Sequence, residues 1–291
     1  MSSEKIIGII GAGSMGMAIA LNLRDRGYTV AIRDVRPEVE NEGRNSGLIV
    51  CDTPQAVAEQ ADLVVITVVN SKQTHEVLFG DQGLTAAQRK NTVILCPTIA
   101  PEDTESLASK LIAAGYDVLD APMSGGPARS RNGTMSLMLA GDDAVIKRHQ
   151  AALEAMSDKI FRLGTRIGDG ARYKLVNNLV AGMNLIASAE AVALGVKLGL
   201  DPKTLVALMS ASSGQSMMME DRLNRALADD YAPRAYAYIL TKDVALGLDM
   251  AKSAGADMAM AKHALEIFKA TLASGMDELD DCAVLKTLLD Q

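Results

Sequence analysis

A lysine and an asparagine stand one helical turn apart at the start of a long apolar segment, and this pair is the first candidate for chemistry. Lys174 and Asn178 precede residues 179–187, which are almost wholly small and apolar. Residues four apart share one face of a helix, and burying an ammonium or an amide group is costly. A single lysine of this kind more often extends its amine from an apolar helix into water. The pair instead indicates a site for an oxygen-rich ligand.

A glycine-rich motif follows the first apolar run of the chain. That run, residues 6–10, leads into Gly11, Ala12, Gly13, Ser14, Met15 and Gly16, and a helical pattern comes next. In a strand–turn–helix unit the first glycine permits the tight turn, and the second lets backbone N–H groups approach a pyrophosphate. The third allows the helix to pack closely on the strand. A glycine turn without a ligand is the alternative, but the flanking strands and helix fall where a dinucleotide-binding βαβ unit requires them.

An aspartate ends the second predicted strand, at close to the ~20-residue spacing expected after the glycine motif. Asp34 can accept hydrogen bonds from an adenosine ribose and would repel a 2′-phosphate, which favours NAD over NADP. Arg33 and Arg36 flank it and could hold a phosphate. The sequence therefore predicts NAD as the preferred cofactor, with NADP possible.

A second loop follows a strand near residue 120. Ser124, Gly125 and Gly126 offer a hydroxyl and unobstructed backbone N–H groups, an arrangement suited to a carboxylate. The same residues would equally suit an ordinary Pro/Gly turn.

The order of the predicted elements indicates two domains. Alternating strands and helices in the first half predict an α/β domain with a doubly wound, mostly parallel sheet, over residues 1–164. Helical patterns alone fill residues 165–291, and the long helix that carries Lys174 is expected to join the two domains. The expected strands are 5–10, 29–33, 63–68, 92–95, 117–119, 135–140 and 160–163. The expected helices are 15–26, 54–60, 102–114, 171–197, 202–210, 218–228, 236–254, 259–274 and 281–289.

Composition narrows the class of protein. The net charge of -7 and the 3% aromatic content argue against a nucleic-acid partner, and no apolar run approaches the ~20 residues of a membrane span. Cys51, Cys96 and Cys282 are widely spaced, which indicates reduced thiols and no metal site. We expect a cytoplasmic protein without a metal, a nucleic-acid partner or a membrane anchor.

Taken in order, these motifs resemble the β-hydroxyacid dehydrogenase family. The matching segments are 11–16 with Asn22-Leu23, then Asp120-Ala121-Pro122-Met123-Ser124-Gly125-Gly126, then Gly168-x-Gly170-x-x-x-Lys174-x-x-Asn177-Asn178, and Lys242-Asp243-Val244-Ala245-Leu246. Residues 68–71 and 76–80 look most similar to the threonate dehydrogenase branch. Pro97 stands where the family commonly has serine, Met123 replaces a valine, and 68–70 lacks the usual proline.

The resemblance implies a role for each matching residue. Lys174 is similar to the catalytic lysine and Asn178 to the asparagine that helps to hold the substrate. Ser124, Gly125 and Gly126 correspond to the carboxylate loop. Cofactor contacts are implied for Val68, Val69, Thr98 and Lys242, although Lys242 taken alone could equally be a surface lysine paired with an acid.

The implied function is NAD(P)-dependent hydride transfer to or from a small, anionic hydroxy acid of three or four carbons. Lys174 would be the general acid/base, and partial burial would lower the pKa of such an amine from about 10.4 toward neutrality. A non-catalytic NAD sensor or scaffold on the same fold and an imine reductase are the alternatives. The all-α half, with its apolar helix and Met-rich stretches, predicts a homodimer or homotetramer.

Overall fold

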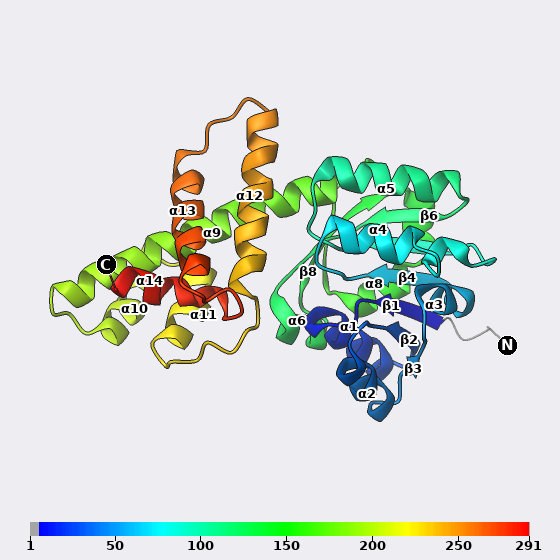
Figure 1. The fold of residues 1–291 in the computed structure, drawn as a ribbon, viewed down its shortest axis with the longest axis horizontal. Helices are drawn as coiled ribbons and strands as arrows, with labels where there is room; N and C mark the ends of the chain where they lie inside the picture. Colours follow the sequence, from blue (N-terminus) through cyan, green and yellow to red (C-terminus); the bar gives the residue numbers. More distant parts are fainter. Residues whose placement is uncertain (1–5, 291) are drawn as a thin grey trace. The chain divides into compact units, whose positions relative to one another are not determined.

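The computed structural model describes residues 6–290, which divide into two compact units on either side of the Lys174–Leu175 bond. The first unit is built on a mostly parallel sheet with strand order β3-β2-β1-β4-β5-β6-β8-β7, and β9 pairs with β8 (Figure 1). Strands β1 to β6 are parallel to one another, whereas β8 runs antiparallel to β6 and to β7. This confirms the predicted doubly wound Rossmann fold, and the structure shows that the strand order reverses beside β1.

Where a strand or a helix was predicted, the observed bounds lie close to the predicted ones. The strands are β1 (Ile6–Ile10), β2 (Thr29–Arg33), β3 (Ile49–Val50), β4 (Leu63–Ile66), β5 (Thr92–Leu95), β6 (Asp117–Asp120), β7 (Met123–Ser124), β8 (Ser136–Gly141) and β9 (Lys159–Arg162). The helices of this unit are α1 (Ser14–Asp25), α2 (Pro37–Asn45), α3 (Pro54–Gln60), α4 (Ser71–Phe79), α5 (Pro101–Ala113), α6 (Gly126–Asn132), α7 (Asp143–Arg148) and α8 (Gln150–Met156), with a 3-10 turn η1 (Leu84–Ala86). The expected start of the first strand at Lys5 lies outside the described residues.

Alternate residues of the central strands face two separate cores. Ile7 and Ile9 of β1 pack with α1, α7 and α8, whereas Ile10 packs with α3, α4 and α5 on the opposite face (Figure 1). Strand side chains alternate between the faces of a sheet, so a strand covered on both sides must be apolar throughout. That requirement explains the unbroken apolar runs in the sequence.

The second unit is helical in its described part, as predicted. Its elements are the greater part of α9 (Asp169–Lys197), then α10 (Pro202–Ser210), α11 (Met217–Ala226), α12 (Ala237–Ser253), α13 (Ala259–Ala273), η2 (Asp281–Ala283) and α14 (Val284–Leu289). Their apolar faces enclose one core around Phe268, which is fully buried. Gly182 and Gly247 let these helices approach closely: an added Cβ at Gly247 would lie 2.7 Å from a carbon of Leu179.

Helix α9 is long and apolar enough to cross a membrane by length and composition. Half of its most apolar window is buried against other parts of the protein. Leu185, Ala189 and Val192 belong to the core of the helical unit. Because these side chains pack against protein, this part of α9 is a core helix of the helical unit.

Several short elements were not predicted. Helices α2, α4, α6, α7 and α8 and strands β3 and β7 lie in segments for which we predicted no element. Helix α2 has almost no buried face, since Gly43 is its one fully buried residue. Elements this short or this exposed carry little hydrophobic periodicity, which is the signal that identifies a helix in a sequence.

A buried ion-pair network stabilises the helical unit near its last helix. Asp280 is fully buried and accepts backbone N–H groups from Arg234 at 2.8 Å and Ala235 at 3.1 Å. Its Oδ2 also forms an ion pair with Arg225 Nη1 at 3.0 Å, although the geometry of this contact is not that of a hydrogen bond. Burial alone would raise the pKa of this carboxyl, but the N–H groups and the Arg225 guanidinium outweigh it and lower the pKa of Asp280 to about 2.

Asp280→Asn should destabilise the protein and change its response to acid. The substitution leaves the buried guanidinium of Arg225 short of a counter-ion, so we expect the free energy of unfolding near neutral pH to fall by about 3 kcal/mol. Because the folded pKa lies below the ordinary 3.8, the wild-type carboxylate contributes stability above pH ~4 that is lost as pH falls toward ~2. Urea denaturation across this pH range should show that the variant lacks this acid-sensitive contribution to the free energy of unfolding.

Asp277→Asn is the matched control, because Asp277 is exposed in the same segment. An equal loss of stability in both variants would contradict the role of the network.

Candidate functional site

The predicted cofactor residues of the first unit all lie at one edge of its sheet. The glycine motif follows β1, Asp34 follows β2, Val68 and Val69 follow β4, and Thr98 follows β5. Carboxyl ends of parallel strands meet at the same edge, and a ligand binds where the strand order reverses. Here that place is beside β1, which pairs with both β2 and β4.

Two glycines of the motif, Gly11 and Gly16, leave no room for a side chain. Gly11 has a φ of +92°, and an added Cβ would lie 2.8 Å from Val68 Cγ1. At Gly16 an added Cβ would lie 2.3 Å from the carbonyl oxygen of Gly11, a contact that no adjustment of a side chain relieves. The Thr67 hydroxyl also donates to that carbonyl at 2.7 Å and fixes the turn to the end of β4. The motif is therefore held tightly between β1, β4 and α1.

The start of α1 can receive an anion. Gly13 precedes the helix in an extended conformation, no side chain caps the first turn, and no acidic residue occupies it. The first backbone N–H groups of a helix have no partners within it and favour negative charge. Ala12 is buried, Ser14 is exposed, and half-buried Met15 receives a weak hydrogen bond from Ser130. A dinucleotide pyrophosphate thus fits the residues present.

Asp34 is buried beside this turn and is held by an arginine. The Arg36 side chain donates from Nε to Asp34 Oδ1 at 2.9 Å and from Nη2 to Oδ2 at 3.2 Å, and its backbone N–H donates to Oδ1 at 3.0 Å. An added Cβ at Gly13 would lie 3.0 Å from Arg36 Nη2, so the guanidinium reaches the glycine turn. Arg33 pairs instead with Glu40. Arg33 also donates to the backbone carbonyl of Asp34, so Arg36 is the one of the two flanking arginines whose guanidinium contacts the Asp34 carboxylate.

Three residues that follow β4 and β5, namely Val68, Val69 and Thr98, are half-buried. Val68 and Val69 follow β4, and the Val69 N–H donates to Gln73 of α4 at 2.9 Å. Thr98 is half-buried between two buried residues, Pro97 and Ile99. These positions expose backbone and small side chains, which suits contact with the flat ring of a cofactor.

The predicted carboxylate loop forms a sharp turn before α6. Gly125 and Gly126 have φ values of +137° and +73°, and Ser124 is half-buried. An added Cβ at Gly125 would meet the Arg129 side chain at 2.9 Å. Gly126 begins α6, so the loop ends in the first turn of a short helix. The structure thus has a glycine turn that leads into a short helix, and we expect this turn to be able to receive a carboxylate.

Lys174 lies in the second turn of α9 and is only 8% exposed. The N-terminus of this helix is anchored by Asp120, a buried residue at the end of β6 that accepts the Gly168 N–H at 2.8 Å. Asp120 belongs to a recognised motif, but sequence reasoning gave it no role. Its only sequence signal was its place before the carboxylate loop.

Asn178, one turn after Lys174, belongs to a polar network in the helical unit. Its Nδ2 donates to Asp243 Oδ2 at 2.7 Å, and its Oδ1 accepts from Asn177 at 3.1 Å. Lys242 Nζ lies 2.6 Å from Asp243 Oδ1. Asp243, missed from the sequence although it follows Lys242 directly, therefore joins the two predicted residues. The ion pair with Asp243 also agrees with the alternative prediction for Lys242, a helix lysine paired with an acid.

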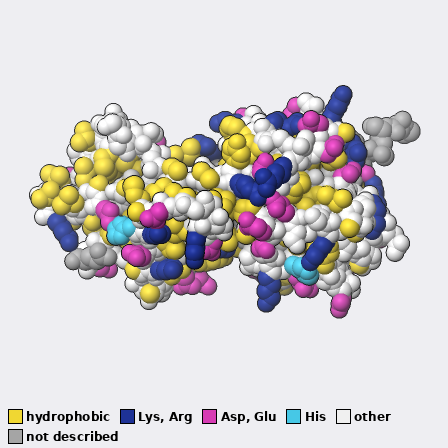
Figure 2. All heavy atoms as spheres, turned by 90° about the horizontal axis from the view of Figure 1, so that it is seen from above, with side chains coloured by type: hydrophobic (Ala, Val, Ile, Leu, Met, Phe, Trp, Pro, Cys, Tyr) yellow, Lys and Arg dark blue, Asp and Glu magenta, His cyan; other side chains and the backbone are white. Residues whose placement is uncertain are grey.

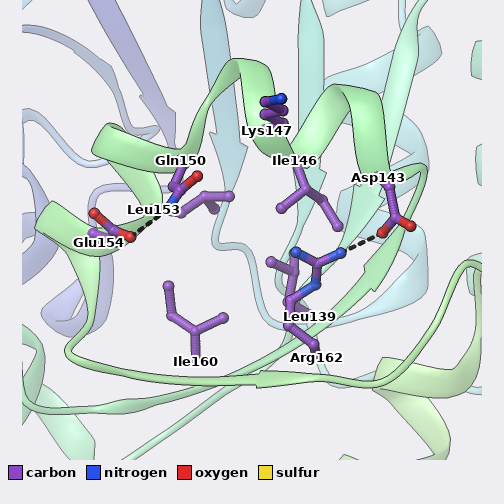
Figure 3. Close-up of a pocket in the computed structure, with 9 residues that line it drawn as sticks. All are labelled: Leu139, Asp143, Ile146, Lys147, Gln150, Leu153, Glu154, Ile160 and Arg162. Atoms are coloured by element: carbon purple, nitrogen blue, oxygen red, sulfur yellow. Dashed lines mark hydrogen bonds and ion pairs between the residues drawn. The ribbon is translucent and has the colours of Figure 1, made fainter.

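A hollow elsewhere on the first unit contains different residues. Its lining residues are Leu139, Asp143, Ile146, Lys147, Gln150, Leu153, Glu154, Ile160 and Arg162 (Figure 3). Arg162 and Asp143 form an ion pair across the hollow. Within α8, Gln150 donates to Glu154 at 2.8 Å. No predicted site residue lines it, so we locate the candidate site at the strand ends.

Comparisons with known proteins agree with this geometry. The model for the NAD binding domain of 6-phosphogluconate dehydrogenase matches residues 6–164, and the model described as "NAD-binding of NADP-dependent 3-hydroxyisobutyrate dehydrogenase" matches residues 168–288. The chain is 37% identical to an L-threonate dehydrogenase of Cupriavidus necator, covering 96% of this chain and 95% of that protein. It is 31% identical to a 2-hydroxy-3-oxopropionate reductase of Escherichia coli, covering 97% and 96%.

The chain is also similar to a solved structure over nearly its whole length. The crystal structure of a 3-hydroxyisobutyrate dehydrogenase from Salmonella typhimurium is similar with a TM-score of 0.92 at 30% identity, covering 97% of this chain and 99% of that one. The similarity extends over both units. Together with the glycine motif, these matches establish that the chain uses a nicotinamide cofactor.

Asp34→Ala should change the choice of cofactor. The substitution removes the carboxylate that can accept from a ribose and releases the Arg36 guanidinium to meet a 2′-phosphate. We expect the apparent KM for NAD to rise by about tenfold or more, as for a lost charged hydrogen bond, and the KM for NADP to change little or fall. Asp52→Ala, an exposed aspartate after β3, is the control. Equal effects on both cofactors would remove Asp34 as the discriminating residue.

Proposed function

The chain belongs to the β-hydroxyacid dehydrogenase family, and we propose that it interconverts a small hydroxy acid of three or four carbons and the corresponding carbonyl compound. The observation that carries the proposal is the pairing of a buried Lys174 with Asn178 on α9 in a chain that also has the dinucleotide turn. Residues 1–164 would bind the dinucleotide, and residues 165–291 would supply substrate contacts and the surface for self-association.

Lys174 is the proposed general acid/base. When an alcohol is oxidised, its hydroxyl proton must leave, and an amine within reach can accept that proton; in the reverse direction the ammonium returns it. A bound nicotinamide supplies the complementary chemistry, the exchange of a hydride with the carbinol carbon. The low exposure of Lys174 restricts exchange of its proton with bulk water.

Two groups are proposed to hold the substrate. The backbone N–H groups of Gly125 and Gly126 with the Ser124 hydroxyl would bind a carboxylate. Asn178 has a second Nδ2 hydrogen besides the one directed to Asp243, and that hydrogen can donate to a substrate oxygen. Each of these groups by itself suits an oxygen of an anionic hydroxy acid.

The proposed cofactor is NAD in preference to NADP, because Asp34 is buried beside the turn that would bind the pyrophosphate. The residues proposed to contact the cofactor are those at positions 11–16, Asp34, Val68, Val69, Thr98 and Lys242. Relatives named L-threonate dehydrogenase support a four-carbon sugar acid as the first substrate to test. The cytoplasm is the proposed location, consistent with three buried free thiols.

Lys174→Ala should abolish most turnover while leaving cofactor binding intact. General acid–base assistance contributes about 10²- to 10⁴-fold, so kcat should fall by that order. The assay is NADH or NADPH formation with threonate, 3-hydroxyisobutyrate and other three- and four-carbon hydroxy acids, together with NADH binding followed by fluorescence. Lys197→Ala, an exposed lysine at the other end of α9, is the control.

Different results would support other classes of protein. NADH binding without turnover on any acid would favour a nicotinamide sensor or scaffold. Reduction of cyclic imines without hydroxy-acid oxidation would favour an imine reductase. Near-normal turnover by Lys174→Ala would remove that residue from the mechanism.

Self-association is the last part of the proposal. Leu194, Leu198 and Leu208 of the helical unit are 59%, 67% and 61% exposed, and hydrophobic side chains gather at the left of Figure 2, on this unit. Exposed apolar patches of this kind mark interaction surfaces. We infer a homodimer or homotetramer formed through this surface.

Leu194→Glu should weaken the assembly. A charge in an apolar interface costs its desolvation, so the mass measured by light scattering should fall toward 30.7 kDa at micromolar concentration. Lys203→Glu, an exposed charged site on α10, is the control. A wild-type protein that is monomeric at working concentration would contradict the proposal.

A further inference from the structure

Asp120 is a buried carboxylate that faces the start of α9. It is 1% exposed, and its Oδ2 accepts N–H groups from Gly168 at 2.8 Å and from Ala171 at 3.3 Å. Gly168 directly precedes the helix and Ala171 lies in its first turn. The carboxylate therefore satisfies backbone donors that the helix cannot satisfy within itself.

The two glycines of the Gly168-x-Gly170 motif fit this contact. Gly168 has a φ of +95°, which allows the chain to turn into the helix. An added Cβ at Gly170 would lie 2.7 Å from Asp120 Oδ1 and 2.8 Å from the carbonyl oxygen of Met138. The second contact is with backbone and cannot be relieved by rotating a side chain. Gly170 thus lets the helix approach the carboxylate closely.

We propose that Asp120 is a positioning residue, which holds the N-terminus of α9 against the end of β6 and so fixes the place of Lys174. Asp120 also leads, through β7, into the loop at Ser124. One carboxylate then ties the strand that enters the proposed carboxylate loop to the helix that carries the proposed acid/base. The catalytic part of this inference rests on the proposed function, whereas the contact itself does not.

The charge of Asp120 also has an electrostatic effect. The N-terminus of a helix carries roughly half a positive charge, and the carboxylate offsets it one turn before Lys174. Burial raises the pKa of Asp120 to about 6, although the N–H groups of Gly168, Ala171 and Gly170 oppose that shift, so at neutral pH the group is mostly ionised.

Other charged groups surround the same turn. Asp169 raises the pKa of Asp120 by repulsion, and the buried Cys96 thiol also lies within its field. On the outer side of α9, Arg172 donates to Glu105 at 2.7 Å and to Asp169 at 3.1 Å, and Arg166 lies 3.5 Å from Glu105. Asp120 is the one of these carboxylates that accepts the buried N–H groups at the start of the helix.

The first test measures whether Asp120 holds the helix. Asp120→Ala leaves two buried N–H groups without an acceptor, so amide hydrogen exchange in residues 168–175 of the full chain should accelerate about tenfold. Gly170→Ala should also accelerate it, although alanine normally stabilises a helix relative to glycine. Asp117→Ala is the matched control, because Asp117 begins the same strand and pairs with Arg148. Exchange that is equal in Asp120→Ala and Asp117→Ala would overturn the proposal.

The second test separates positioning from folding. Asp120→Asn keeps the shape of the side chain but removes the charge that offsets the helix N-terminus. The rate at which the Lys174 amine is acylated, followed by mass spectrometry of its peptide, should then rise about two- to fivefold at pH 7, and its pH profile should move to lower pH. A merely structural residue would leave this profile unchanged, and an unchanged profile would contradict the proposed electrostatic effect.

Turnover supplies a third readout. Asp120→Ala should lower kcat about a hundredfold with the Kd for NAD unchanged, because a small displacement of a catalytic group has an effect of this size. If the wild type oxidises none of the hydroxy acids, the proposed function fails, but the exchange and acylation results still decide the role of Asp120. If the wild type is active and Asp120→Ala retains its kcat, the positioning role is wrong.

Discussion

The site depends on one constraint, the parallel pairing of β1 with both β2 and β4. Because strand order reverses there, the segments after these strands diverge and leave room at the edge of the sheet. The contact between Gly16 and the carbonyl of Gly11 then brings α1 as close to that edge as backbone allows. Asp34, Val68 and Thr98 reach the same edge only because all their strands run in one direction.

Much of the fold could be predicted because the relevant signals are local. A strand buried on both faces must be apolar at every position, and the glycine motif marks the turn that follows it. The bounds of β2, β5, α3 and α10 were predicted to the residue. Short elements such as α2 and α6 were missed because two turns of helix with little buried surface leave no periodic pattern.

The polar partners of the site were harder to predict. Lys174 and Asn178 stood out because their spacing is local, but Asp120 and Asp243 act through contacts across the chain. Asp120 lies 48 positions from Gly168, and Asp243 lies 65 from Asn178. Sequence reveals that an aspartate is present; only the folded backbone determines which N–H group or amide it meets.

The hydrogen bonds of Asn178 restrict the chemistry of a partner. Since its Nδ2 donates to Asp243 and its Oδ1 accepts from Asn177, the two ends of the amide cannot exchange places without breaking both bonds. One Nδ2 hydrogen and one lone pair of Oδ1 then remain for further partners, and each keeps a fixed place. A hydroxyl, carbonyl or carboxylate oxygen can accept the Nδ2 hydrogen, whereas an ammonium group can only meet the oxygen, so the two ends of the amide differ in the ligand groups that they can receive.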